Sequence, residues 1–349
     1  MKAKITISAV FIAATISSAT IAKSLPKDAN AAALAMQTTV SEQAIRVKAS
    51  TFQTNYPFNT ANLENFSALL GQAQRPVLNQ SGHFLIYRPA KRITGVVVIV
   101  PGSEGVRDGL LGEHIRHFLA MSYAVAVVNS YTIRGHSHVL IDQAAISLPS
   151  QVLDVVLVMN KLRLMKEFSS LPMGLFGTSR GGMAISLLLD KRLLNTMNVS
   201  EPTWACVLYP SADVHYDYKT IVPVKLPFLY VVAQKDDEVS PQKAIDYSDV
   251  VHRKNSAMQR IVWPLAVHLF DAPFSKVWLA EGASALHVPE VIVTAEGLFH
   301  FKRKTYPTWT GIVQQVNAYV TKGIHIGYTN KSNIEISRMI KQFVEKQGN

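Results

Sequence analysis

The chain has 349 residues, of which 48% are hydrophobic and 17% charged, and its formal net charge is +11. A chain of this kind can bury a large core, and no internal repeat or low-complexity linker divides it, so one domain accounts for most of its length. The single cysteine, Cys206, excludes an intramolecular disulfide and lies in an apolar stretch typical of buried residues. Nothing resembles a nucleic-acid-binding module, so the charge indicates a basic surface or an affinity for anionic polymers or acidic substrates.

The amino-terminal segment predicts export. Lys2 and Lys4 precede an uncharged stretch from Ile5 to Ala22 that contains small residues near its end. This pattern is typical of a secretory signal peptide over residues 1–22, cleaved after Ala19 or Ala22; a retained membrane anchor is the alternative. No later segment is long and apolar enough to span a bilayer. We therefore expect a periplasmic or secreted protein with no stable membrane span after cleavage and a net charge of +9 once both lysines are lost.

The rest of the chain divides into an arm and an α/β domain. Residues 23–75 are rich in Pro, Asn, Gln and Ala and predict an extended arm with packing helices, of unknown role. The second part, residues 76–349, alternates apolar strand runs with helical patterns over residues 81–264, which predicts an α/β fold with a doubly wound, mostly parallel sheet and flanking helices. The strand runs are His83–Tyr87, Val96–Val100, Ala124–Val128, Met173–Gly177, Trp204–Tyr209, Phe228–Ala233 and Arg260–Trp263.

A long segment separates the last predicted strand from the last helix, which we expect at about residues 333–346. The segment of about residues 272–330 is longer than the connection that the fold needs at this point, so we interpret it as an insertion. It could form a lid or a wall of a substrate pocket, and surface padding is an equal alternative.

The first motif follows the run Gly95–Val100, whose β-branched residues predict a central strand buried on both faces. The run leads into Pro101-Gly102-Ser103-Glu104-Gly105. A loop that leaves the carboxyl end of such a strand can supply a backbone N–H to an oxyanion hole. Ser103 is the first candidate for that N–H and Glu104 the second.

The central motif is Gly177-Thr178-Ser179-Arg180-Gly181, placed where an apolar run gives way to a helical pattern. This is the pattern of a nucleophile elbow, in which a serine on a strained strand-to-helix turn exposes its hydroxyl above the sheet. The N–H of Arg180, the residue after the nucleophile, is the other oxyanion-hole candidate. Taken alone, Ser179 could be an ordinary helix N-cap, and the motif gains weight only from the residues that follow it.

An acid and a histidine follow in the expected order. Asp236 lies just past the strand run Phe228–Ala233, and His268 lies in the loop after Arg260–Trp263. The order Ser, Asp, His is that of α/β hydrolases and differs from that of chymotrypsin-like proteases. Asp237 is the alternative acid if the loop is shifted by one residue. Asp236 could otherwise be a turn residue and His268 a loop residue bonded to backbone, but the three together predict a Ser179, His268, Asp236 triad.

On these residues the chain resembles the dienelactone hydrolase family of α/β hydrolases. The resemblance covers about residues 80–275 and carries five matches beside the elbow: the glycine loop Pro101–Gly105, the stretch Tyr123–Gly135, Tyr209-Pro210, Asp236-Asp237 and Ala266–Asp271. The best-known members use a cysteine nucleophile, whereas this chain has Ser179. The resemblance therefore implies an ester, lactone or thioester hydrolase that acts on a small molecule without a cofactor, rather than an enzyme for dienelactone itself.

The sequence leaves the substrate and several alternatives open. Arg107, Arg134 and Arg180 fall near the carboxyl ends of strands, where one of them could bind a substrate carboxylate, with Glu104 as a further contact. The aromatic-rich stretch Phe299–Trp309 favours an apolar acyl group instead, if it folds over the site. The same fold also serves serine peptidases and acyltransferases, and an inactive binding protein is the remaining alternative. His136, His138 and Asp142 lack the further ligands of a binuclear metal site, so we expect no metal.

Overall fold

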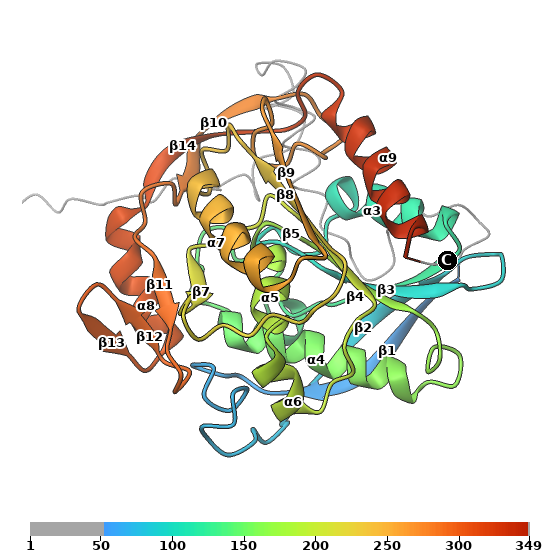
Figure 1. Cartoon of the computed structure of the whole chain (residues 1–349), viewed down its shortest axis with the longest axis horizontal. Helices are drawn as coiled ribbons and strands as arrows, with labels where there is room; N and C mark the ends of the chain where they lie inside the picture. The colour runs from blue at the N-terminus through green and yellow to red at the C-terminus, as the bar shows by residue number, and fades with distance from the viewer. Residues whose placement is uncertain (1–51, 348–349) are drawn as a thin grey trace, which may run out of the picture.

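The computed structural model describes residues 52–347, which form an eight-stranded sheet with helices on both faces (Figure 1). The strand order is β1-β2-β4-β3-β5-β6-β8-β9. From β4 onward neighbouring strands are parallel, and β1 and β2 complete one edge in antiparallel pairing. The strands are β1 (Phe52–Thr60), β2 (Gln80–Arg88), β3 (Gly95–Val100), β4 (Tyr123–Val127), β5 (Met173–Thr178), β6 (Trp204–Leu208), β8 (Phe228–Ala233) and β9 (Met258–Trp263).

The central strands are apolar on both faces because helices cover both. Every residue of β3, β4, β5, β6 and β8 is buried. Helices α3 (Asp108–Ala120) and α9 (Ser332–Glu345) pack into the hydrophobic cluster on one face. The opposite face is covered by α4 (Leu148–Leu164), α5 (Ser179–Leu188), α6 (Lys191–Met197) and α7 (Pro241–Lys254). The predicted doubly wound, mostly parallel α/β sheet is confirmed, and each predicted strand is present.

The predicted arm, residues 23–75, differs from the expectation where the structure describes it. Residues 52–60 form β1, which pairs with β2 along nine residues, from Phe52 opposite Arg88 to Thr60 opposite Gln80. Turns and irregular chain follow to residue 79, so no packing helix occupies the described part of the arm. The predicted signal peptide and residues 23–51 lie outside the described residues.

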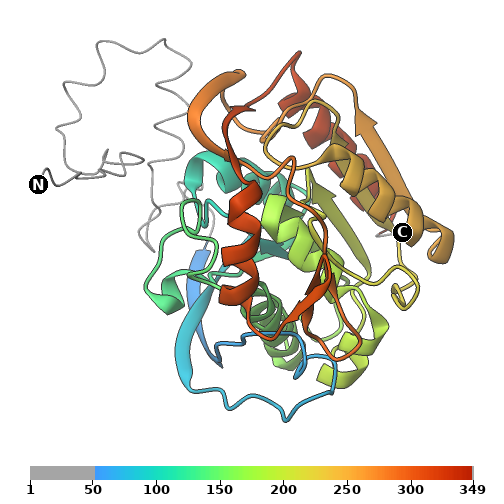
Figure 2. The same ribbon diagram turned by 90° about the vertical axis from the view of Figure 1, so that its left-hand side faces the viewer.

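The insertion builds two small sheets beside the main one. Strands β10 (Val277–Ser284) and β14 (Thr321–Ile326) pair as a two-stranded antiparallel ribbon. Figure 1 shows this ribbon above the carboxyl ends of β8 and β9, and the view in Figure 2 brings much of the insertion to the front. The other sheet joins β7 (Val214–Tyr216) to β11 (Val291–Val293), β12 (Phe299–Phe301) and β13 (Lys304–Tyr306), next to α8 (Trp309–Val316). Within residues 52–347, no helix has the length and apolar character to cross a membrane.

Candidate active site

The strained turn between β5 and α5 carries Ser179. Its backbone φ is +48°, in the left-handed region that a serine rarely adopts, and the residue is 5% exposed. The flanking glycines allow this turn to fit against its neighbours. A side chain at Gly181 would collide with the carbonyl of Val100 at the end of β3, and one at Gly177 would collide with the backbone of Gly181. The turn therefore has the geometry of a nucleophile elbow, held beside the loop that leaves β3.

The structure brings Ser179, His268 and Asp236 into one hydrogen-bonded chain. Ser179 Oγ lies 3.0 Å from His268 Nε2, and His268 Nδ1 lies 2.7 Å from Asp236 Oδ2. The other oxygen of Asp236 accepts the backbone N–H groups of Glu238 and Val239 at 2.9 and 3.0 Å, which fixes the carboxylate in the loop. Each side chain follows a different parallel strand, β5, β8 or β9. These distances allow a proton to pass from the hydroxyl to the imidazole.

The surroundings of His268 are both aromatic and acidic. The ring packs edge-to-face on Tyr209, with the ring centroids 4.7 Å apart. Glu238 Oε2 lies 3.7 Å from His268 Nε2, on the same nitrogen that faces Ser179. Burial lowers the pKa of His268, but the carboxylates of Asp236 and Glu238 outweigh this effect and raise the pKa to about 10. Burial also raises the pKa of Glu238 to about 7 and that of Glu104 to about 7.

The two candidate oxyanion residues flank the elbow. Arg180 is the second residue of α5, so its N–H belongs to the unbonded first turn of the helix. Its guanidinium points away into the core, where it donates to Gln143, Gln151 and the carbonyl of Ile146, with the Trp309 ring 5.2 Å away. Ser103 lies in the loop after β3, and its hydroxyl accepts from the Gln143 amide at 3.0 Å. Gln143 thus connects both candidate residues, a link that the sequence did not reveal.

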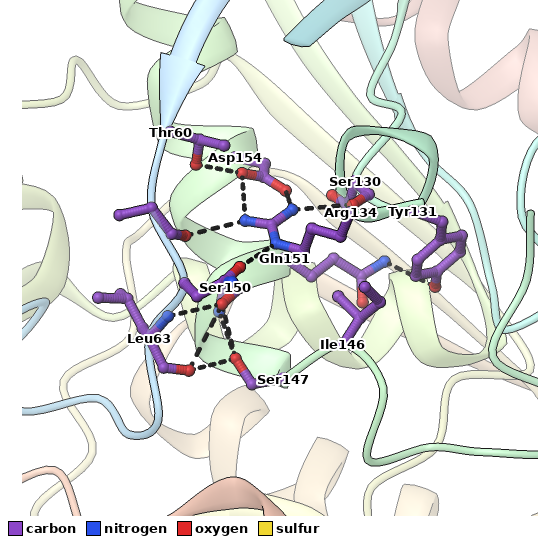
Figure 3. Close-up of polar contacts among 12 residues, drawn as sticks. Thr60, Leu63, Ser130, Tyr131, Arg134, Ile146, Ser147, Ser150, Gln151 and Asp154 are labelled. Atoms are coloured by element: carbon purple, nitrogen blue, oxygen red, sulfur yellow. Dashed lines mark hydrogen bonds and ion pairs between the residues drawn. The ribbon is translucent and has the colours of Figure 1, made fainter. Parts of the chain in front are cut away.

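Arg134 is buried in an ion pair, contrary to its expected place at a pocket mouth (Figure 3). An arginine has five N–H donors. Here Nε donates to Asn62, one terminal nitrogen to Ser130 O and Asp154 Oδ2, and the other to Ala61 O and Asp154 Oδ1. No donor remains for a substrate carboxylate. The prediction that Arg134 contacts substrate is therefore wrong: its partner is an acid on α4 that the sequence did not connect with it.

Because this ion pair is buried, we expect it to matter for stability. The Asp154 side chain is fully buried, and replacing it with alanine would leave the Arg134 cation buried without a counter-ion. Asp154→Ala should lower the free energy of unfolding by about 3–5 kcal/mol, measured by urea denaturation. The matched control is Glu167→Ala, which breaks the more exposed Arg88–Glu167 pair and should cost less than about 1 kcal/mol. Equal effects of the two substitutions would contradict the structural role.

Arg107 and Glu104 belong to the loop after β3. Arg107 Nε donates to the backbone carbonyl of Glu104 at 2.9 Å, and both residues are buried. The Glu104 carboxyl lies against Gly102, where a side chain would collide with it, and its charge acts on His268. Arg107 therefore secures the loop, while Glu104 is placed where its charge acts on His268. Contact of either residue with a substrate stays a prediction.

The ribbon β10–β14 supports the loops that carry Asp236 and His268, which the sequence did not predict. Asp237 accepts the backbone N–H of His325 and pairs with its Nδ1, each at 2.7 Å. Ala285 N–H donates to Glu238 O at 2.7 Å, and the Ser284 hydroxyl donates to Asp237 O. On the histidine side, the N–H of Gly327 donates to His268 O at 2.9 Å. The insertion is therefore a support for the site, and the only signal in the sequence was the pair of adjacent acids.

The aromatic stretch that could have covered the site lies mainly in the core. Phe299 and Phe301 are buried in the cluster on the α4 and α5 face, and Trp309 packs on Phe299 with ring centroids 5.7 Å apart. Trp309 contacts Arg180 through its ring and donates a hydrogen bond from its indole N–H to Gln143 O. Over residues 52–347, no three or more His, Cys, Asp or Glu side chains gather as a metal ion would require.

The strand order, the elbow and the order Ser, Asp, His are those of an α/β-hydrolase fold.

No protein-family model and no curated protein matches the sequence. Similar solved structures are esterases and dienelactone hydrolases. A Pyrococcus furiosus esterase is 12% identical over 63% of this chain and 85% of its own, with a TM-score of 0.45. A cold-adapted esterase from an Arctic intertidal metagenomic library is 13% identical over 64% of this chain and 88% of its own, with a TM-score of 0.46. A dienelactone hydrolase of Anabaena variabilis is 17% identical over 63% of this chain and 90% of its own, with a TM-score of 0.46. Similarity of this degree concerns the fold alone.

Proposed function

We propose that the protein is a serine hydrolase that cleaves a small carboxylic ester, lactone or thioester through an acyl-enzyme. The observation that carries the proposal is the chain of hydrogen bonds from Ser179 through His268 to Asp236, built on a strained elbow. If Ser179 were only a helix cap and Asp236 only a turn residue, neither a strained elbow nor a shared hydrogen bond with His268 would be needed. The three residues act together only when a nucleophile, a base and an orienting acid are needed.

In this mechanism Ser179 Oγ attacks the carbonyl carbon and gives its proton to His268 Nε2. Asp236 keeps Nδ1 protonated, so that Nε2 is the acceptor, and stabilises the imidazolium that forms. The backbone N–H groups of Arg180 and Ser103 bind the oxyanion. His268 then returns the proton to the leaving alcohol or thiol. Water, deprotonated by His268, attacks the acyl-enzyme, releases the acid and restores the serine.

A fluorophosphonate probe and a panel of short esters test the proposal together. The probe should label the wild-type protein, and mass spectrometry of the peptides should place the adduct on Ser179. The panel should show turnover that the probe abolishes. Protein that neither reacts with the probe nor hydrolyses any ester would favour the inactive binding protein. Faster acyl transfer to an added alcohol or amine than to water would identify an acyltransferase, and cleavage of peptides alone would identify a peptidase.

The acidic surroundings of His268 predict an alkaline activity profile. With its pKa raised to about 10, the imidazole of the free protein carries both protons at neutral pH and cannot accept another. Since only the unprotonated base is active, kcat/KM should rise with pH through that pKa, well above the ordinary histidine value of about 6.5. The measurement is kcat/KM for a short p-nitrophenyl ester between about pH 6 and about pH 11, corrected for spontaneous hydrolysis. A plateau already reached at about pH 7 would contradict it.

We also propose that the protein is exported to the periplasm or beyond the cell. The proposal rests on the signal-like segment from Lys2 to Ala22, which lies outside the described residues. Mass spectrometry of the protein from its native host should find an amino terminus near Thr20 or Lys23. An intact Met1 on a soluble cytoplasmic form would refute export.

A further inference from the structure

One carboxylate beside the triad has no task in the mechanism above. Glu238 Oε2 lies 3.7 Å from His268 Nε2, the nitrogen that lies 3.0 Å from Ser179 Oγ. Asp236 already orients the imidazole from its other nitrogen. Glu238 therefore lies next to the atom that hands the proton to the leaving group, and so next to the leaving group itself.

The backbone of Glu238 fixes this position. Its N–H donates to Asp236 Oδ1 at 2.9 Å, and its carbonyl accepts from Ala285 at 2.7 Å. The Glu238 side chain keeps 21% of its surface exposed, compared with 2% each for His268 and Asp236. Glu238 is therefore the most exposed of these three side chains.

The charges around Nε2 are predominantly negative. The Glu238 carboxylate interacts electrostatically with the His268 imidazolium and with the carboxylates of Asp236 and Asp237. Glu104 adds a further negative charge near His268. Two of the three arginines are engaged elsewhere, Arg134 on Asp154 and Arg180 among glutamine and backbone oxygens. Arg107 donates to the Glu104 carbonyl, and its charge interacts with the Glu104 carboxylate rather than with Glu238. A substrate carboxylate would be repelled here, and a substrate cation would be attracted.

We propose that Glu238 is a specificity residue that binds a cationic group on the leaving alcohol of the substrate, so that the preferred substrates are esters of amino or quaternary ammonium alcohols. This proposal rests on the proposed ester hydrolysis. It also couples binding to catalysis. A cation beside Nε2 lowers the proton affinity of the imidazole, whose proton leaves to solvent, so the arriving substrate generates the neutral base that attack by Ser179 requires.

The test compares two esters of the same shape and different charge, acetylcholine and 3,3-dimethylbutyl acetate. In the wild type, kcat/KM should favour acetylcholine by about tenfold or more, as expected for one partly buried charge contact. Glu238→Gln should bring this ratio close to one. Glu281→Gln, which removes an exposed carboxylate on β10, is the matched control and should keep the wild-type ratio. Glu238→Lys should reverse the preference.

A second measurement uses the unmodified protein. Tetramethylammonium chloride should inhibit hydrolysis of the choline ester competitively, and sodium chloride at the same ionic strength should not. Equal ratios in wild type and Glu238→Gln, a wild-type preference for the neutral ester, or hydrolysis of neither ester by protein whose Ser179 reacts with the fluorophosphonate would overturn the proposal. Loss of both labelling and hydrolysis would instead reject the proposed function.

Discussion

Replacing Ser179 with alanine is expected to lower kcat for a short p-nitrophenyl ester by about 10⁴-fold or more. Without the hydroxyl no acyl-enzyme can form, and only the oxyanion N–H groups and binding remain to assist direct attack by water. The elbow itself should persist, because Gly177 and Gly181 determine its close contacts. The measurement is initial rate against substrate concentration, with the thermal unfolding midpoint recorded on the same samples. Activity within a few-fold of the wild type in folded Ser179→Ala protein would refute the assignment of the nucleophile.

Asp236→Asn is expected to lower kcat by about 10³- to 10⁴-fold, because the amide can hold the imidazole in the wrong tautomer and cannot stabilise the imidazolium. The geometry supports this residue over its neighbour. Asp236 Oδ2 lies 2.7 Å from His268 Nδ1, whereas Asp237 Oδ2 lies 2.7 Å from Nδ1 of a different histidine, His325.

Asp237→Asn is the matched control, since it makes the same chemical change one residue away in the same loop. It should retain most of the activity, with a loss of no more than about tenfold, because it weakens the contact with the ribbon and leaves the hydrogen bond to His268 intact. Steady-state kinetics of both variants, purified in parallel, decide the matter. A larger loss of kcat in Asp237→Asn than in Asp236→Asn would show that the acid had been assigned to the wrong residue.

The sequence predicted those parts of the fold that local pattern determines. β3 and β8 are continuous apolar runs of six residues, and a run of this kind predicts a strand buried on both faces whatever its neighbours. β1 contains Pro57 and several polar residues, so its pattern carries no such signal. It becomes a strand only through its pairing with β2 at the sheet edge, where proline is tolerated.

The candidate site was predictable in its residue types and order but not in its surroundings. Ser179, Asp236 and His268 each follow a recognisable strand, and parallel strands bring their carboxyl ends to one edge. The partners of Arg134 and Asp237 depend on contacts between distant segments, which no local pattern records. Glu238 has the sequence appearance of an ordinary polar turn residue. Only the fold of the loop around Asp236 places its carboxylate beside Nε2.

The β10–β14 ribbon separates the stability of the candidate site from that of the molecule as a whole. Its strands bury few residues, whereas the central sheet is buried throughout, so the ribbon can open locally at a lower free energy than global unfolding. When it opens, the contacts of His325 with Asp237 and of Gly327 with His268 are lost together, while the sheet keeps its secondary structure. The unfolding midpoint seen by circular dichroism is therefore an upper limit on the temperature at which the protein can work.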